Sequence, residues 1–242
     1  IQRAEKIPYK KIPRPIWPTD EFEDLARYSG LKEIERLSRF HVLNHKAVAK
    51  KYAQDINKKY EELNLVVCHM GGGISVAIHH HGKMIDGNNG LDGDGPFSTD
   101  RSCGLPVGQL VDMCYSGKYS YEEMKKKIKG FGGLMSYLGE TDVKKIQQKA
   151  LEGHDKTSLQ ALQAMCYQTS KEIAAMATVV GGEIDAILIT GGMAHSEFLM
   201  NEIKKRVSFI APVYLYPGEF EMESLGLSVY KALIGEEEIK EL

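Results

Sequence analysis

Hydrophobic residues along this chain form two patterns, short continuous runs and longer stretches with helical spacing. The run at 63–68 is apolar almost throughout, which is typical of a strand covered on both faces of a sheet. The other continuous runs are equally short and are bounded by glycine, proline and polar residues. We predict strands over 63–68, 74–78, 83–85, 184–189 and 213–216.

Helical spacing dominates the remaining stretches. Apolar residues recur at helical intervals between Asp20 and Gly30, where a first helix is predicted to end. Strands that alternate with helices indicate an α/β fold. Further helices are predicted over 44–59, 107–116, 120–129, 140–152, 157–180, 195–207 and 222–234.

Histidines and prolines mark two segments outside these elements. His79, His80 and His81 precede Gly82 between two predicted strands, so we expect a hairpin turn with three exposed histidines. His45 and His154 are expected at the surface or behind a site. Residues 1–19 carry four prolines and are predicted to be extended and outside the core.

Two of the predicted strands run into glycine clusters. The first leads into Gly71, Gly72 and Gly73, and the strand at 184–189 leads into Gly191 and Gly192. Glycines leave backbone N–H groups uncovered by side chains, which suits the binding of phosphate or a nucleotide. The pair of clusters predicts two sides of one nucleotide cleft.

Composition narrows the class of protein. The 242 residues carry a net charge of −2 without a long basic stretch, which disfavours nucleic acid as a partner. The four cysteines lack metal or CxxC spacing, as in a reduced, cytosolic protein. No run approaches about 18 apolar residues, so no membrane span is expected. The chain begins without Met, which is expected of a fragment.

The segment 69–108 holds candidate chemistry. His69 and the following glycines resemble an esterase oxyanion loop, but no serine has the flanking glycines of a nucleophile elbow. Phosphoryl transfer fits better, because Arg101 can pair phosphate oxygens with a planar fork. The acidic residues of the loop either cap turn amides or lie near a divalent metal: Asp86, Asp92 and Asp94.

Several motifs together resemble butyrate kinases, which belong with acetate kinases in the actin-like ATPase and sugar-kinase superfamily. The resemblance covers about residues 20–242. It implies an α/β, ribonuclease H-like domain with a mixed sheet flanked by helices. The motifs are Phe40-His41 with His45-Lys46, Cys68 to Ser75, Asp92 to Ser98 with Arg101-Ser102, Gly132 to Gly139, Ile189 to Gly192, and Ser208 to Val213.

The resemblance implies transfer of a phosphoryl group between ATP and butyrate or a similar short or branched carboxylate, giving an acyl phosphate and ADP. By resemblance, His41 and Arg101 stabilise the phosphoryl group and His69 lies beside it. The alternative for both is a structural role: His41 could be a hydrogen-bonded core histidine, and His69 could only orient the turn. Gly71, Gly72 and Gly73 match the phosphate loop; Gly191, Gly192 and Met193 match the adenosine motif.

The cofactor implied is Mg²⁺, with Glu221 or Glu223 at the family's metal-associated glutamate. A cytoplasmic location and a homodimer follow from the same resemblance.

Residues 1–19 do not match, so 20–242 is predicted to be the C-terminal nucleotide-binding domain. The family's first domain has no counterpart here, so we expect little kinase activity from this polypeptide alone. The alternative function is a non-catalytic nucleotide-binding fragment of such a kinase. In the family the helix at 222–234 packs on that first domain, so its face bearing Leu225, Val229 and Leu233 is expected to lack a partner.

Overall fold

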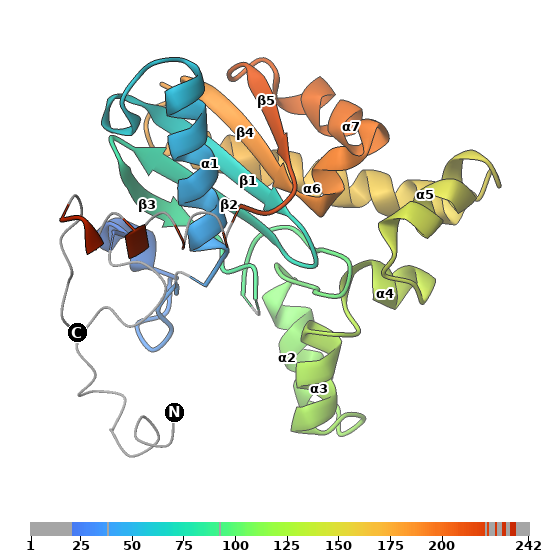
Figure 1. The fold of residues 1–242 in the computed structure, drawn as a ribbon. Coiled ribbons are helices and arrows are strands. Elements are labelled where there is room, and N and C mark those ends of the chain that lie inside the picture. Colours follow the sequence, from blue (N-terminus) through green and yellow to red (C-terminus); the bar gives the residue numbers. More distant parts are fainter. Residues whose placement is uncertain are drawn as a thin grey trace.

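A computed structural model describes residues 21–37, 39–91 and 93–220, with positions 222, 226, 229, 230 and 233–235. Its centre is a five-stranded mixed sheet in the order β3-β2-β1-β4-β5 (Figure 1). β1 pairs antiparallel with β2 and parallel with β4, and β4 pairs parallel with β5. Each strand contains most of a predicted run, with these bounds: β1 Asn64–Met70, β2 Ile74–His80, β3 Lys83–Gly87, β4 Ala186–Gly191 and β5 Val213–Pro217.

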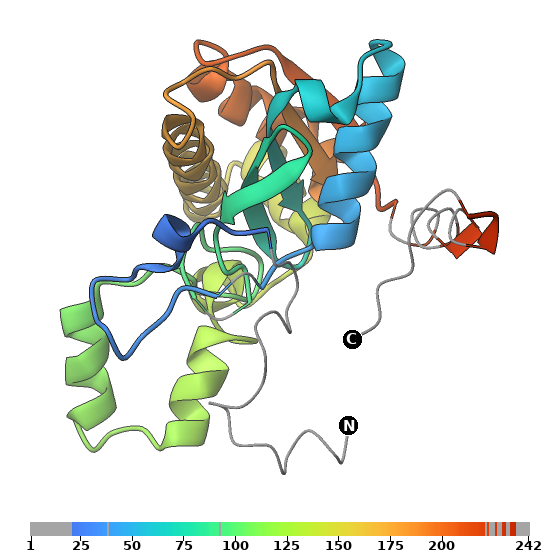
Figure 2. The ribbon, with the colours of Figure 1, turned by 90° about the vertical axis from the view of Figure 1, so that its left-hand side faces the viewer.

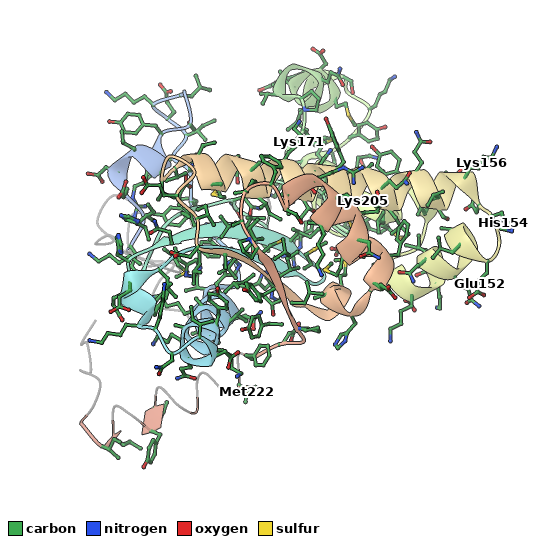
Figure 3. All side chains as sticks on the ribbon, turned by 90° about the horizontal axis from the view of Figure 1, so that it is seen from above. Glu152, His154, Lys156, Lys171, Lys205 and Met222 are labelled. Atoms are coloured by element: carbon green, nitrogen blue, oxygen red, sulfur yellow. The ribbon has the colours of Figure 1, made fainter. Side chains whose placement is uncertain are left out.

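Helices cover both faces of this sheet, so the molecule is layered, as Figure 3 shows from above. α1 (Val42–Asp55) lies on one face, and α6 (Lys156–Thr178) and α7 (Glu197–Val207) lie on the other. Successive residues of β1 point to opposite faces. Leu65 therefore joins the core under α1, and Val66 joins the larger core under α6 and α7. The predicted two-sided burial of this strand is confirmed.

The segment between β3 and α6 holds four shorter helices. α2 and α3 stand as a pair away from the sheet (Figure 2). α4 was not predicted as a helix, and the others match their predicted ranges. The bounds are α2 Val107–Tyr115, α3 Tyr121–Ile128, α4 Gly133–Leu138 and α5 Val143–Leu151. Short 3₁₀ turns include η4 (Tyr60–Glu62), just before β1, and η5 (Gly192–His195), just after β4.

The helix predicted after Asp20 is wrong in extent. Only a single 3₁₀ turn forms there, η3 (Asp24–Arg27), and Tyr28 then makes a β-bridge with Glu35. Phe22 and Ala26 are buried but Leu25 is 82% exposed, so only part of the predicted apolar face packs against the core. Helical spacing without a packing partner does not sustain a helix.

The predicted exposure of His79 is also wrong, because His79 is fully buried. His45, expected at the surface or behind a site, is fully buried too and contacts Ser75, which in turn contacts His41. β2 continues past its predicted end and turns at 81–82, so its pleat directs His79 into the core, where Nδ1 lies 2.7 Å from the Tyr60 hydroxyl. His45 on α1 places Nε2 2.9 Å from Ser75 Oγ. The two imidazole rings stack nearly parallel, with centroids 5.8 Å apart.

Some predictions fall on residues outside the described part of the chain. They concern residues 1–19, Asp92, Glu221, Glu223 and Leu225. The described positions 222, 226, 229, 230 and 233 are helical, and Val229 and Leu233 are 57% and 78% exposed. Among the described residues, no helix has the length and apolar character needed to cross a membrane.

The buried histidines predict an acid-sensitive fold. Burial lowers the pKa of His79 from 6.5 to about 3, and that of His45 well below 6.5. Below pH 6.5 the unfolded chain takes up protons that the folded chain does not, so stability falls as pH falls toward 3. Each histidine contributes up to about 1.4 kcal/mol per pH unit.

Urea unfolding between pH 7 and 5 measures this slope. We expect His79→Gln to unfold with a shallower pH dependence than the unchanged chain. The control is His154→Asn, at the exposed turn between α5 and α6 (Figure 3), which should keep the original slope. Equal slopes in His79→Gln and the unchanged chain would contradict the assignment.

Candidate active site

The two glycine clusters lie side by side at one edge of the sheet. β1 and β4 run parallel, with His69 opposite Thr190, so both strands end at the same edge. Gly191 has φ of +90°, and a Cβ there would lie 2.5 Å from the Met70 carbonyl oxygen. Only glycine fits such a close approach in this conformation. Both clusters therefore belong to the same wall of any ligand site.

The turn between β1 and β2 presents two free backbone donors. The carbonyl of Gly72 accepts hydrogen bonds from Ser98 Oγ at 2.8 Å and Thr99 Oγ1 at 3.2 Å. Because a trans peptide points its N–H opposite its C=O, the amide of Gly73 faces away from these two hydroxyls. The amides of Gly72 and Gly73 have no acceptor among the described residues. They are available to an anion.

Arg101 lies directly against this turn. Its Nη1 donates to the carbonyl of Gly90 at 2.7 Å, and a Cβ on Gly73 would collide with the guanidinium. Its Nε is buried without a hydrogen-bond partner, and the nearest carboxylate oxygen, of Asp100, is 3.8 Å away. This nitrogen faces the Asp100 carboxylate in an ion pair that is too long for a hydrogen bond, so neither buried atom is saturated.

The segment carrying Arg101 is braced by the start of α4. The amide of Gly132 donates to the Asp100 carbonyl at 3.1 Å, and that of Leu134 to the Ser98 carbonyl at 3.0 Å. Gly133 has φ of +55°, and a Cβ there would meet the Ser98 carbonyl. The Gly132-Gly133 pair, singled out in the sequence, thus holds the Arg101 turn in place.

His41 and His69 form the other part of the site. His41 stands at the start of α1 and stacks on His69, near the end of β1, with ring centroids 3.8 Å apart and 16° between planes. Burial lowers the pKa of His41 to about 4, with a further contribution from Arg101. Burial, then His41 and Arg101, lower the pKa of His69 to about 3. Both imidazoles are therefore neutral at pH 7.

Two residues that contact these histidines were missed in the sequence. Asn44 Nδ2 lies 2.7 Å from His69 Nδ1, and Ser75 Oγ lies 3.0 Å from His41 Nδ1. Asn44 is one helical turn after His41, on the same face of α1, and this spacing could have indicated it. Ser75 is opposite His69 in the β1–β2 register, which requires knowing the hairpin.

The remaining predicted residues are less directly engaged. Gly192 is exposed at the turn, whereas the Met193 side chain is 7% exposed and packs in the larger core. Asp86 and Asp94 both pair with Arg36, at 3.0 and 3.1 Å, and accept hydrogen bonds from turn amides. Within the described ranges, no three His, Cys, Asp or Glu side chains group as metal ligands.

Comparisons with known proteins show what this chain is similar to. A family model described as the acetokinase family matches residues 28–210. The chain is 52% identical over 217 residues to a "Probable butyrate kinase" of Bacteroides thetaiotaomicron, covering 90% of this chain and 61% of that protein. It is 51% identical over 222 residues to "Butyrate kinase 1" of Clostridium acetobutylicum, covering 92% and 62%. The chain thus spans about three fifths of these relatives' length.

Solved structures show the same fold. The acetate kinase of Porphyromonas gingivalis superposes with a TM-score of 0.77 at 16% identity, covering 86% of this chain and 60% of that one. A propionate kinase from Francisella tularensis gives 0.73 at 20% identity, covering 82% and 58%. The predicted actin-like ATPase fold is confirmed. The family model matches well over half of the residues of this chain, and the chain therefore belongs to the acetokinase family.

Proposed function

We propose that this chain binds ATP and stabilises the phosphoryl group in an enzyme that phosphorylates a short-chain carboxylate. The observation that carries this is the convergence of Arg101, two neutral histidines and the free amides of Gly72 and Gly73 at one sheet edge. Butyrate or a similar acid is the proposed substrate because both curated relatives are named butyrate kinases.

The chemistry needs positioning and charge neutralisation more than covalent help. A carboxylate oxygen attacks the γ-phosphorus of ATP while the bond to the β-phosphate oxygen breaks, giving an acyl phosphate and ADP. The Arg101 guanidinium would neutralise charge on the phosphoryl oxygens, and the glycine amides and imidazole N–H groups would donate to them. The neutral imidazoles add donors without placing further positive charge beside Arg101.

Nucleotide binding is proposed at the adjoining turn after β4. Gly191 and Gly192 would let the adenosine approach the backbone, and Met193 would contribute through its backbone because its side chain is in the core. Mg²⁺, with Glu221 or Glu223 as the proposed associated residue, would offset phosphate charge when bound. A cytoplasmic location and a homodimer are proposed from the family resemblance alone.

Calorimetric titration with ATP and a coupled assay for ADP with butyrate and Mg²⁺ test the function. We expect ATP to bind, and butyrate-dependent ADP formation would assign catalysis to this chain. ATP binding without ADP formation would favour the alternative, a nucleotide-binding fragment of a kinase. Failure to bind ATP would overturn both functions.

Arg101→Gln should weaken the site selectively. Losing the guanidinium beside the turn with Gly72 and Gly73 should reduce turnover by about 10²- to 10³-fold and should also weaken ATP binding. The control is Arg206→Gln on α7, where the guanidinium pairs with Glu202 on the same helix. If both variants bind ATP equally well, Arg101 does not contact phosphate.

A pair of glycine substitutions separates phosphate binding from general turn stability. Gly73→Ala should displace Arg101, because its Cβ would collide with the guanidinium. Gly72→Ala adds the same methyl group to the same turn, but with nothing within 4 Å of it. We expect ATP affinity to fall at least tenfold in Gly73→Ala and much less in Gly72→Ala, as measured by calorimetry. The reverse order would contradict this geometry.

A further inference from the structure

We propose that Asn44 and Ser75 are positioning residues that hold His69 and His41 as neutral imidazoles with their protons on Nε2. Each histidine then presents an N–H donor at the atom left free by the surrounding protein. The inference rests on the proposed function for its purpose, the donation of two hydrogen bonds to phosphoryl oxygens. The hydrogen-bond geometry that supports it does not depend on any ligand.

The orientation of the Asn44 amide follows from a backbone donor. The amide N–H of Phe220 lies 2.9 Å from Asn44 Oδ1, and a backbone N–H can only donate. Oδ1 must therefore face Phe220, and Nδ2 must face His69 and Thr190. The amide nitrogen has no lone pair to accept with, so it donates to both.

Thr190 Oγ1 and His69 Nδ1 can both accept the hydrogen bonds that Asn44 Nδ2 donates. Thr190 Oγ1 donates to the Gly218 carbonyl at 3.1 Å, so toward Asn44 it is an acceptor. His69 Nδ1 must likewise be an unprotonated nitrogen, which places the single proton of the neutral ring on Nε2. Asn44 and Thr190 are fully buried and His69 is 1% exposed, so water does not compete for these bonds.

The proton of His41 is placed by a comparison of costs. Ser75 Oγ lies 3.0 Å from His41 Nδ1 and 2.9 Å from His45 Nε2, and one hydroxyl proton serves only one of them. His45 Nδ1 is buried without a partner. If His45 accepted from Ser75, that orphan atom would be an N–H, whose burial costs more than that of a bare lone pair.

In the favoured arrangement, hydrogen-bond donation runs from His45 through Ser75 to His41. His45 Nε2–H donates to Ser75 Oγ, and Ser75 Oγ–H donates to His41 Nδ1. The proton of neutral His41 is then on Nε2, as in His69. Neither Nε2 bonds to a described residue, and neither is among the fully buried unpaired atoms of the described part of the chain. His69 Nε2 also lies 2.9 Å from the position of a Cβ on Gly71, which places it at the phosphate turn.

Histidine ¹⁵N NMR of the full chain at pH 7, without nucleotide, tests the assignment directly. We expect pyridine-type Nδ1 signals for His41 and His69 and pyrrole-type Nε2 signals. An internal reference is His80, whose Nδ1 lies 2.7 Å from Asn64 Oδ1 while Asn64 Nδ2 donates to the Glu183 carbonyl. His80 should therefore carry its proton on Nδ1. A proton on Nδ1 of His69 or His41 would overturn the proposal.

Asn44→Asp reverses the polarity of the contact at nearly constant shape. A carboxylate only accepts, so His69 should move its proton to Nδ1 while the Phe220 amide keeps its acceptor. The matched control is Asn64→Asp, at the other end of β1, which keeps the acceptor for His80 and should leave His69 unchanged. An unchanged His69 tautomer in Asn44→Asp would overturn the proposal. If Asn44→Asp does not fold, the spectrum of the unchanged chain still decides.

Ser75→Ala tests the contact between Ser75 and His41. Without the hydroxyl donor, the His41 signals should shift toward a mixture of the two tautomers, and those of His69 should not. A His41 tautomer that does not respond would overturn the role of Ser75. In ATP binding we expect Asn44→Asp to lose about 10- to 100-fold relative to Asn64→Asp. If the unchanged chain binds no ATP, the proposed function fails, while the tautomers remain decided by NMR.

Discussion

The parallel pairing of β1 with β4 is the constraint on which the site depends. Parallel neighbours end at the same sheet edge, but they require a long crossover between them. Among the described residues, the crossover contains β2, β3, the Arg101 turn and the five helices α2 to α6 before the chain returns at Ala186. The close approach of Gly191 to the Met70 carbonyl joins the two strand ends. The turn with Gly72 and Gly73, proposed to bind phosphate, and the proposed adenosine turn are adjacent for this reason.

Burial determines how charge is distributed at that edge. His41 and His69 stack at 3.8 Å, a separation at which two imidazolium ions would repel each other and Arg101 strongly. Low solvent exposure keeps both rings neutral, so the guanidinium is the fixed positive charge among them. A phosphoryl group entering here would find one cation and several neutral donors. Such an arrangement neutralises transferred charge without the cost of clustering cations.

Local sequence patterns predicted most helices and strands. The features that were missed depend on contacts between residues that are distant in the sequence. The apolar runs located the five strands of the described residues; β1, β2 and β4 are buried almost throughout, whereas β5 is only partly buried. The burial of His79 was missed because its partner Tyr60 precedes β1 and the turn falls later than expected. The glycine clusters and Arg101 followed from the strand pattern and phosphate chemistry, and the roles of His41 and His69 came from a family resemblance.

Their supporting residues could not be found that way. Asn44 is held by Phe220, far along the chain, and Ser75 acts between two histidines of α1. The helical spacing of Asn44 from His41 is the one local signal, because hydrogen bonds between distant residues leave no periodic pattern in a sequence.

The hydrogen bonds of Asn44 and Ser75 constrain the protonation of His69 and His41 to different degrees. Asn44 is oriented by a backbone N–H that cannot accept, so reversing His69 would require breaking two or more buried hydrogen bonds. Ser75 can rotate its hydroxyl, and the reversal of His41 costs only the burial of one unpaired N–H on His45. His69 is consequently confined to donating from Nε2. His41 has the smaller barrier to exchanging its proton, which makes it the ring more responsive to charge that develops on a neighbouring oxygen.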